Sequence, residues 1–202
     1  MSYRVGGIDT AASFDDGVSL LLTGSSTVAN QRLLDAVAPT DGERAVVITT
    51  NTGAKTVVKE LERRGATRDQ IGIIDCTNAD SEVEGVPVRQ LSSPGDLTGI
   101  SLEFAKLFDR DIEEDAFRAR IGFASVSTSL MYTELRTMFR FLHVFTARIR
   151  SGDMFGVFSL DPTMHDEKAH NTIRAVFDCE AAVGEDGLDL SGTGFERLNR
   201  SN

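Results

Sequence analysis

Apolar runs alternate with amphipathic stretches along almost the whole chain. Short continuous apolar runs bounded by glycine or polar residues are typical of strands that are buried on both faces of a sheet. Such runs predict strands over residues 18–24, 44–50, 70–76, 86–91, 118–127 and 154–160. Apolar residues at helical spacing predict a helix beginning at Asn30 and further helices over 55–65, 93–111, 128–152 and 166–178.

The end of the chain departs from this alternation. Residues 179–198 hold two apolar runs around Glu185-Asp186-Gly187, a turn signal that predicts a closing antiparallel hairpin. The alternation elsewhere predicts an α/β fold, with a mostly parallel sheet flanked by helices. No linker, repeat or low-complexity tract is present, so residues 1–202 are interpreted as one domain with its core at about 15–190.

This fold class also predicts where a site would lie. Ligands of parallel sheets bind at the carboxyl ends of the strands. Those ends should bring residues 24–30, 49–55, 124–129 and 160–166 together along one rim.

Composition narrows the choice of partners. The net charge of −10 disfavours a nucleic-acid partner, because a phosphate backbone would be repelled on average. No apolar run approaches the roughly 18 residues of a membrane span, and the first residues lack the layout of a secretory signal, so a cytoplasmic protein is expected. Cys76 and Cys179 are too far apart to indicate a disulfide framework or a metal knuckle, and are interpreted as buried thiols.

One stretch resembles the start of a nucleotide-binding protein. In "SLLLTGSSTVANQRLLDAV" (19–37), an apolar run leads into Thr23-Gly24, a small-residue loop and a helical pattern. With "VFSLDPTMHDEKAHNTIRAVFD" (157–178) and the order of elements, the chain resembles the RecA-like ATPases, in the branch of KaiC, RadA and the gas-vesicle regulator GvpD. Acid excess and arginine in place of lysine resemble the haloarchaeal members of this superfamily. The resemblance implies a RecA-like three-layer sandwich over roughly residues 15–190.

The motifs that give this superfamily its activity are degenerate. A phosphate-binding loop requires G-x-x-x-x-G-K-[ST], and counting from Gly24 the last three places hold Ala29, Asn30 and Gln31. Asn30 is neutral where a lysine would meet the phosphates, and Gln31 is a poor ligand for magnesium. The resemblance therefore implies only a vestigial phosphate loop, made of Gly24, Ser25, Ser26, Thr27 and Asn30.

The acidic positions of the superfamily are also lost. Ala124 stands where the resemblance places the metal-supporting carboxylate, and Thr49 and Thr50 stand where an acid would activate water. Each of these groups is worth orders of magnitude in phosphoryl transfer. No catalytic residue, metal or cofactor is therefore expected, although weak nucleotide or phosphate binding is left open.

The leading hypothesis is a non-catalytic, regulatory or scaffolding protein that acts through a protein partner or as a homo-oligomer. A nucleotide- or phosphate-binding sensor without hydrolysis is the alternative, and a DNA-repair or recombinase paralogue is a further one. The acidic balance and the absence of a concentrated basic loop weigh against the last.

Other polar clusters have ordinary interpretations. Gly53-Ala54-Lys55-Thr56 resembles a phosphate-binding box, but it has no partner glycine upstream and predicts a capped helix start. The hydroxyls of residues 125–129 are interpreted as strand-end and cap residues rather than as nucleophiles. The cluster at 161–170 is interpreted as helix capping by Asp161 or Thr163; a weak metal pair of Asp166 and His170 is the alternative.

The helix predicted over residues 128–152 has two apolar edges. One stripe is ordinary core patterning, and Tyr132, Phe141 and Val144 lie outside it. The second edge indicates either contact with another subunit or packing between neighbouring helices.

Overall fold

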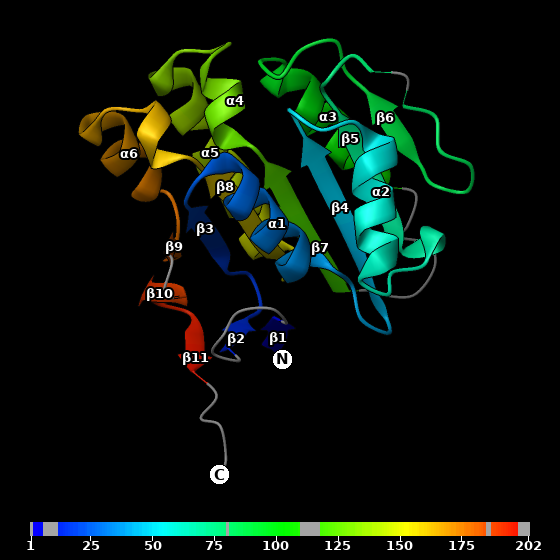
Figure 1. The fold of residues 1–202 in the computed structure, drawn as a ribbon, viewed down its shortest axis with the longest axis horizontal. Helices are drawn as coiled ribbons and strands as arrows, with labels where there is room; N and C mark the ends of the chain where they lie inside the picture. The colour runs from blue at the N-terminus through cyan, green and yellow to red at the C-terminus, as the bar shows by residue number, and fades with distance from the viewer. Residues whose placement is uncertain (1, 6–11, 80, 110–117, 185–186, 198–202) are drawn as a thin grey trace.

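The computed structural model describes residues 2–5, 12–79, 81–109, 118–184 and 187–197. These residues form an eight-stranded central sheet in the order β10-β9-β3-β8-β7-β4-β5-β6 (Figure 1). In chain order its strands are β3 (Ser19–Thr23), β4 (Glu43–Thr49), β5 (Ile71–Asp75), β6 (Val88–Gln90), β7 (Arg118–Ala124), β8 (Phe155–Leu160), β9 (Cys179–Gly184) and β10 (Gly187–Gly192). The predicted α/β fold is confirmed.

Every neighbouring pair in this sheet is parallel except β9 and β10. The closing hairpin is therefore confirmed, although β9 itself runs parallel to β3 and only β10 is antiparallel. Glu185 and Asp186 of the predicted turn lie outside the described residues.

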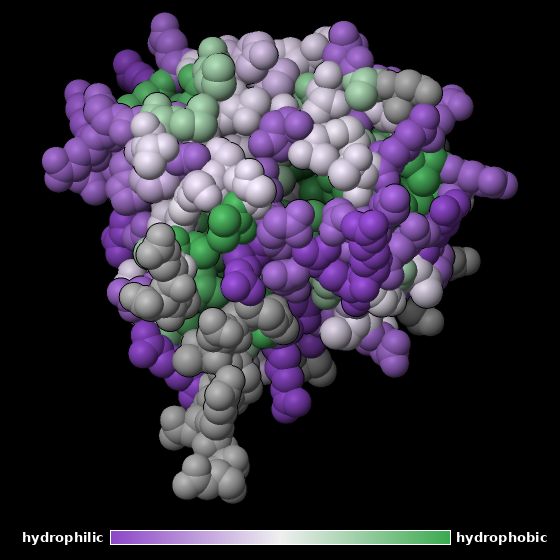
Figure 2. Space-filling view, in the orientation of Figure 1, coloured by the Kyte–Doolittle hydropathy of each residue, from purple (hydrophilic) through white to green (hydrophobic). Residues whose placement is uncertain are grey.

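Helices cover both faces of the sheet because alternate strand residues point to opposite sides. Leu20 and Leu22 belong to one core with the apolar stripes of α1 and α2, whereas Leu21 belongs to the core formed with α3, α5 and α6. The α1–α2 face is toward the viewer in Figure 1, and Figure 2 shows it largely covered by hydrophilic side chains. The helices are α1 (Ser26–Val37), α2 (Ala54–Arg63), α3 (Leu97–Asp109), α4 (Val126–Leu130), α5 (Leu135–Ser151) and α6 (Glu167–Arg174), with 3-10 turns η1 (Arg68–Gln70) and η2 (Pro162–Met164).

The single helix predicted over 128–152 is wrong, since the chain forms α4 and α5 there instead. The Ser125 hydroxyl accepts a hydrogen bond from the Thr128 N–H and caps α4, as the cap interpretation expected. A turn at Met131–Tyr132 follows, and α5 begins after Glu134. Periodicity alone missed this break because no glycine or proline marks it.

A small second sheet was not predicted. Strands β1 (Ser2–Val5), β2 (Ala12–Asp15) and β11 (Phe195–Arg197) form it at the end of the molecule where the central strands begin (Figure 1). Tyr3 and Phe14 are fully buried and pack on the ring of Phe155. The second sheet therefore shares the core of the α1–α2 face.

A buried ion pair lies within the central sheet, and its arginine also reaches the second sheet. Arg120, in β7, is 2% exposed, and its Nε donates to Oε2 of Glu43 at 2.7 Å. Its other nitrogens donate to the carbonyl oxygens of Ala36 and Arg4 at 2.8 and 2.9 Å. Arg120 thus ties β7, α1 and β1 together; a second arginine within the strand, two positions after Arg118, was the sequence signal for this role.

Among the described residues, no helix has both the length and the apolar character that crossing a bilayer requires.

Candidate functional site

The four strand ends that were predicted to share a rim do meet. The Thr50 N–H donates to the Ala124 carbonyl at 2.7 Å, which joins the ends of β4 and β7. The N–H of Asp161 donates to Ser127 Oγ at 2.9 Å, and Asp161 in turn contacts Ser26 at the start of α1. The rim therefore contains the positions that nucleotide-binding relatives would use.

The predicted small-residue loop is not formed. Only Gly24 and Ser25 separate β3 from α1, which begins at Ser26 rather than at Asn30. Thr27 and Asn30 thus lie in the first turns of the helix. A two-residue connection offers few backbone N–H groups to a phosphate, since a phosphate loop wraps the anion with a longer glycine-rich segment.

The N-terminus of α1 already holds a negative charge. The Ser26 N–H and hydroxyl donate to Oδ2 of Asp161 at 2.8 and 2.9 Å. The other oxygen, Oδ1, accepts from the Thr163 N–H and hydroxyl at 3.0 and 2.6 Å. Helix N-termini attract anions, and here the anion is a carboxylate from the end of β8. The expected capping role of Asp161 is confirmed for η2, and its second role at α1 was not foreseen.

Asp161 is held in its charged form. Burial raises its pKa, but the hydrogen bonds from Thr163 and Ser26 outweigh burial and keep the pKa below its usual range. A phosphate oxygen 4 Å from this carboxylate would be repelled by about 4 kcal/mol per pair of unit charges at an effective dielectric constant of 20.

The side chains at the lysine and magnesium positions are occupied with internal contacts. Oδ1 of Asn30 accepts from Ser159 Oγ at 2.7 Å, and its Nδ2 donates to Asn51 Oδ1 at 3.4 Å. Gln31 points toward α2, where its Oε1 accepts from Arg64 Nη2 at 2.8 Å. These residues link α1 to its neighbours and are not aimed at a common ligand.

The residues at the positions where the resemblance implied acids, Thr49, Thr50 and Ala124, connect the strand ends. The Thr50 hydroxyl donates to the Ser125 carbonyl at 2.9 Å and accepts from the Ser125 N–H at 2.7 Å. Thr49 Oγ1 donates to the Thr52 carbonyl at 2.5 Å. Ala124 is buried between these strand ends. None of these three residues offers a carboxylate that could bind a metal or activate water.

A second buried carboxylate occupies the start of α2, and the sequence analysis missed it. Asp75, at the end of β5, is fully buried, and its Oδ2 accepts from the Ala54 N–H at 2.7 Å and from Ser81 Oγ at 2.6 Å. Oδ1 accepts from the N–H and hydroxyl of Thr77 at 2.8 and 2.6 Å. The predicted helix start at residues 53–56 is confirmed, but Gly53 provides no side-chain cap, and Asp75 accepts from the Ala54 N–H instead. A carboxylate that ends an apolar strand was the only sequence signal for Asp75.

His165 lies within hydrogen-bonding distance of a buried serine. Its Nε2 is 2.9 Å from Ser127 Oγ, the same oxygen that accepts from the Asp161 N–H. The pKa of His165 is lowered, mainly by burial and also by the nearby His170. The carboxylates of Asp161 and Asp166 act in the opposite direction and do not cancel this shift. A neutral imidazole nitrogen can accept a hydrogen bond from the Ser127 hydroxyl. Ser127 is fully buried, so this pair stabilises the rim and does not present a nucleophile.

The stability of the protein should depend on the protonation of His165. Its folded-state pKa is below the ordinary value of about 6.5, so the unfolded chain binds more protons in the window between them. The free energy of unfolding should therefore fall as the pH drops below about 6.5. Urea denaturation between pH 7.5 and 5 measures this change in the free energy of unfolding. His165→Gln should flatten this part of the profile, and exposed His143→Gln should not; equal profiles would refute the assignment.

The metal alternative at residues 161–170 has no support from the side chains. Asp166 caps α6 by accepting from the Ala169 N–H at 2.7 Å, and His170 Nε2 lies 3.4 Å from Oε1 of Glu180. No group of three or more metal-ligating side chains occurs within the described ranges. Cys76 and Cys179 are buried free thiols, and burial raises the pKa of each to about 12.

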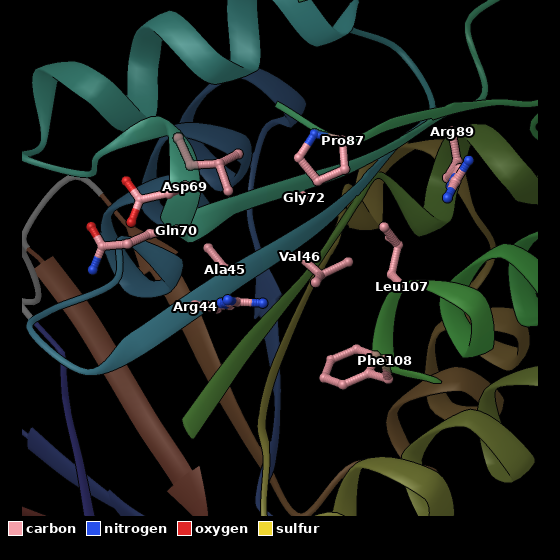
Figure 3. A pocket seen from close by; sticks show the side chains of 11 residues that line it. Arg44, Ala45, Val46, Asp69, Gln70, Gly72, Pro87, Arg89, Leu107 and Phe108 are labelled. Atoms are coloured by element: carbon pink, nitrogen blue, oxygen red, sulfur yellow. The ribbon is translucent and has the colours of Figure 1, made fainter. Parts of the chain in front are cut away.

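A cavity of about 100 Å³ lies at the opposite end of the strands (Figure 3). It is bounded by the first residues of β4 and β5 and by Leu107 and Phe108 of α3, with Arg44 and Arg89 at its edges. Its volume is well below the 300–1,000 Å³ of a typical ligand pocket and suits a few water molecules.

Solved structures with this arrangement define the class. The chain has a RecA-like fold and is similar to a KaiC-like protein, PH0186, from Pyrococcus horikoshii OT3, at 14% identity and a TM-score of 0.62 over 94% of this chain and 86% of that one. PH0321 from the same organism, solved in complex with an unknown peptide, matches at 13% identity and a TM-score of 0.59 over 87% and 82%. PH0250, also from P. horikoshii OT3, matches at 10% identity and a TM-score of 0.59 over 88% and 87%.

The chain itself belongs to a family of unknown function, DUF7504, whose model matches residues 17–183. That match spans β3 to β9 and so includes the whole rim. Comparison with curated proteins finds no match.

Proposed function

We propose that this chain is a pseudo-ATPase, a RecA-like protein without catalysis that acts through contacts with other proteins. One observation carries the proposal: the carboxylate of Asp161 fills the N-terminus of α1, where a phosphate would bind in a nucleotide-binding relative. Because Asn30 supplies no positive charge at the lysine position, that side chain does not offset the repulsion between this carboxylate and a triphosphate.

A protein-binding role also accounts for what the rim retains. Thr50, Asn30 and Asp161 fasten the strand ends and α1 to one another, which gives a rigid scaffold rather than an open pocket. PH0321, which shares the fold, was solved with a peptide bound, so a peptide-binding role is compatible with this architecture.

Calorimetry with magnesium and ATP, ADP or inorganic phosphate tests the proposal. The wild-type protein should show no binding at millimolar ligand and no release of phosphate from ATP, because the anion position is filled from within. Binding of a nucleotide with a submillimolar Kd would favour the sensor alternative, and magnesium-dependent turnover would contradict the proposal outright.

Asp161→Ser provides the complementary experiment. Serine is neutral and shorter, so this variant should expose the Ser26 N–H and gain a rise in Tm with inorganic phosphate that the wild type lacks. Asp166→Ser removes the acidic cap of another helix, α6, and serves as the matched control. A phosphate response of the same size in wild type, D161S and D166S would show that Asp161 does not block the position.

A further inference from the structure

The outward side of α5 is unlike the rest of this acidic chain. The helix has four arginines and one histidine and contains no acidic residue from Leu135 to Ser151, although the net charge of the chain is −10. Arg136, Arg140, His143 and Val144 are exposed at positions i, i+4, i+7 and i+8, and therefore lie on one side of the helix. These four residues are named the α5 face. The opposite side packs in the core through Met138, Leu142, Phe145 and Ile149.

The two arginines at the centre of this face have no acidic partner. In the part of the chain that the structure describes, neither Arg136 nor Arg140 forms an ion pair, whereas Arg150 on the same helix pairs with Asp178 at 2.5 Å. Glu134, just before α5, is the nearest acid in the sequence. His143 stacks on Phe139 with ring centroids 6.2 Å apart. Within the described ranges, the α5 face thus presents positive charge from Arg136 and Arg140 that no ion pair neutralises.

Large apolar side chains are exposed on α5 and in the turn that precedes it. Val144 is 68% exposed, and Met131 and Tyr132, in the turn that leads into α5, are 68% and 61% exposed. Phe141, by contrast, packs against Phe123 and Phe145, so the second apolar edge predicted from the sequence is reduced to Tyr132 and Val144. Exposed arginine, tyrosine and methionine together are typical of protein interfaces.

We propose that the α5 face is the docking surface for an acidic segment of another protein, one that carries apolar side chains between its carboxylates. Charge complementarity favours this occupant: the two unpaired arginines would meet its carboxylates while Val144 and Tyr132 receive its apolar groups. Nucleic acid fits less well, because a phosphate backbone would face a chain of net charge −10 and would leave the exposed apolar side chain of Val144 without a partner. This inference deepens the proposed function and rests on it for the view that the chain acts through protein contacts.

Photocrosslinking tests the surface in cells that make the protein naturally. With p-benzoylphenylalanine in place of Val144, irradiation should yield an adduct whose cross-linked peptide, identified by mass spectrometry, is acidic and contains apolar residues. The double substitution R136E/R140E should reduce the adduct at least tenfold. K59E/R63E, which makes the same charge change on α2 at the opposite face of the sheet, should leave it within twofold.

The other outcomes each overturn the surface assignment. They are an adduct with a second copy of this chain, an adduct with nucleic acid, a cross-linked peptide without acidic residues, no adduct, or equal losses in both double variants. Circular dichroism of each variant confirms that it is folded. Nucleotide binding in the calorimetry would overturn the proposed function and leave the adduct unchanged, so the two failures are distinguishable.

Discussion

Replacing Glu43 with alanine should lower the free energy of unfolding by about 3–5 kcal/mol, measured by urea denaturation at pH 7. Glu43 is 5% exposed and accepts from Arg120, and Arg118 lies 3.6 Å away. Burial raises the pKa of Glu43, but the hydrogen bonds from Arg120 and Thr40 outweigh burial and hold the pKa low. Removing the carboxylate leaves the Arg120 guanidinium buried without a counter-charge.

Two variants show whether this loss comes from the uncompensated charge. E43L/R120M removes both charges, so it should recover at least half of the loss even though the bonds to Ala36 and Arg4 are gone. Arg150→Ala breaks an ion pair whose arginine is 63% exposed and should cost no more than about 1 kcal/mol. If E43A costs no more than R150A, an uncompensated buried charge on Arg120 is not the source of the loss.

Replacing Asp75 with alanine should lower the free energy of unfolding by at least about 3 kcal/mol, because it leaves several buried donors without an acceptor. Those donors are the Ala54 N–H at the start of α2, the N–H and hydroxyl of Thr77, and the Ser81 hydroxyl. Asp75→Asn keeps one acceptor oxygen and should lose roughly half as much. Thermal and urea denaturation of the three proteins at pH 7 measure the difference.

The pH dependence of this loss shows whether the charged form of Asp75 is what stabilises the protein. Burial raises the pKa of Asp75, but hydrogen bonds from Ser81, Thr77 and Ala54 outweigh burial and lower it. Because the folded-state pKa of Asp75 is depressed, its carboxylate contributes its full stabilisation at pH values above the ordinary pKa of about 3.9. This stabilisation is lost as the pH falls through the folded-state pKa. The difference in the free energy of unfolding between wild type and D75A should therefore decrease only below about pH 4.

A surface carboxylate provides the control for Asp75. Asp189 is 90% exposed and lies 4.0 Å from Arg197, so Asp189→Ala should change the free energy of unfolding by less than about 0.5 kcal/mol at any pH. If D75A behaved like D189A, the buried carboxylate would not be what anchors α2.

Much of the fold could be predicted from the apolar pattern. The strands β3, β4, β5 and β8 and the helix α2 lie within a few residues of their predicted positions, because each combines a clear period with a clear boundary. The positions of the strand ends then followed from the parallel sheet, which is why the rim was predicted correctly. The break at Met131–Tyr132 and the short strands β1 and β2 had no such boundary signal.

The candidate site was harder to predict, because its decisive contacts join distant parts of the chain. Ser26 and Asp161 are 135 positions apart, and Ala54 and Asp75 are 21 apart. The sequence identified Asp161 or Thr163 as a helix cap, which is a local property; Asp161 caps the 3-10 turn η2, and Asp166 caps α6. That the Asp161 carboxylate also fills the start of α1 depends on the adjacency of β3 and β8 in the sheet.

The sequence by itself determined the α/β class, most of the strands and helices of the central sheet, and the neutral residues at Ala29, Asn30 and Ala124. Those features depend on residue identity and local periodicity, which are fully present in the chain. Only the tertiary structure decided the long-range contacts: Asp161 and Asp75 lie at two helix starts, Arg120 pairs with Glu43, and two α5 arginines form no ion pair with the described residues. Electrostatic energy depends on distances through space and on burial, and folding alone sets both.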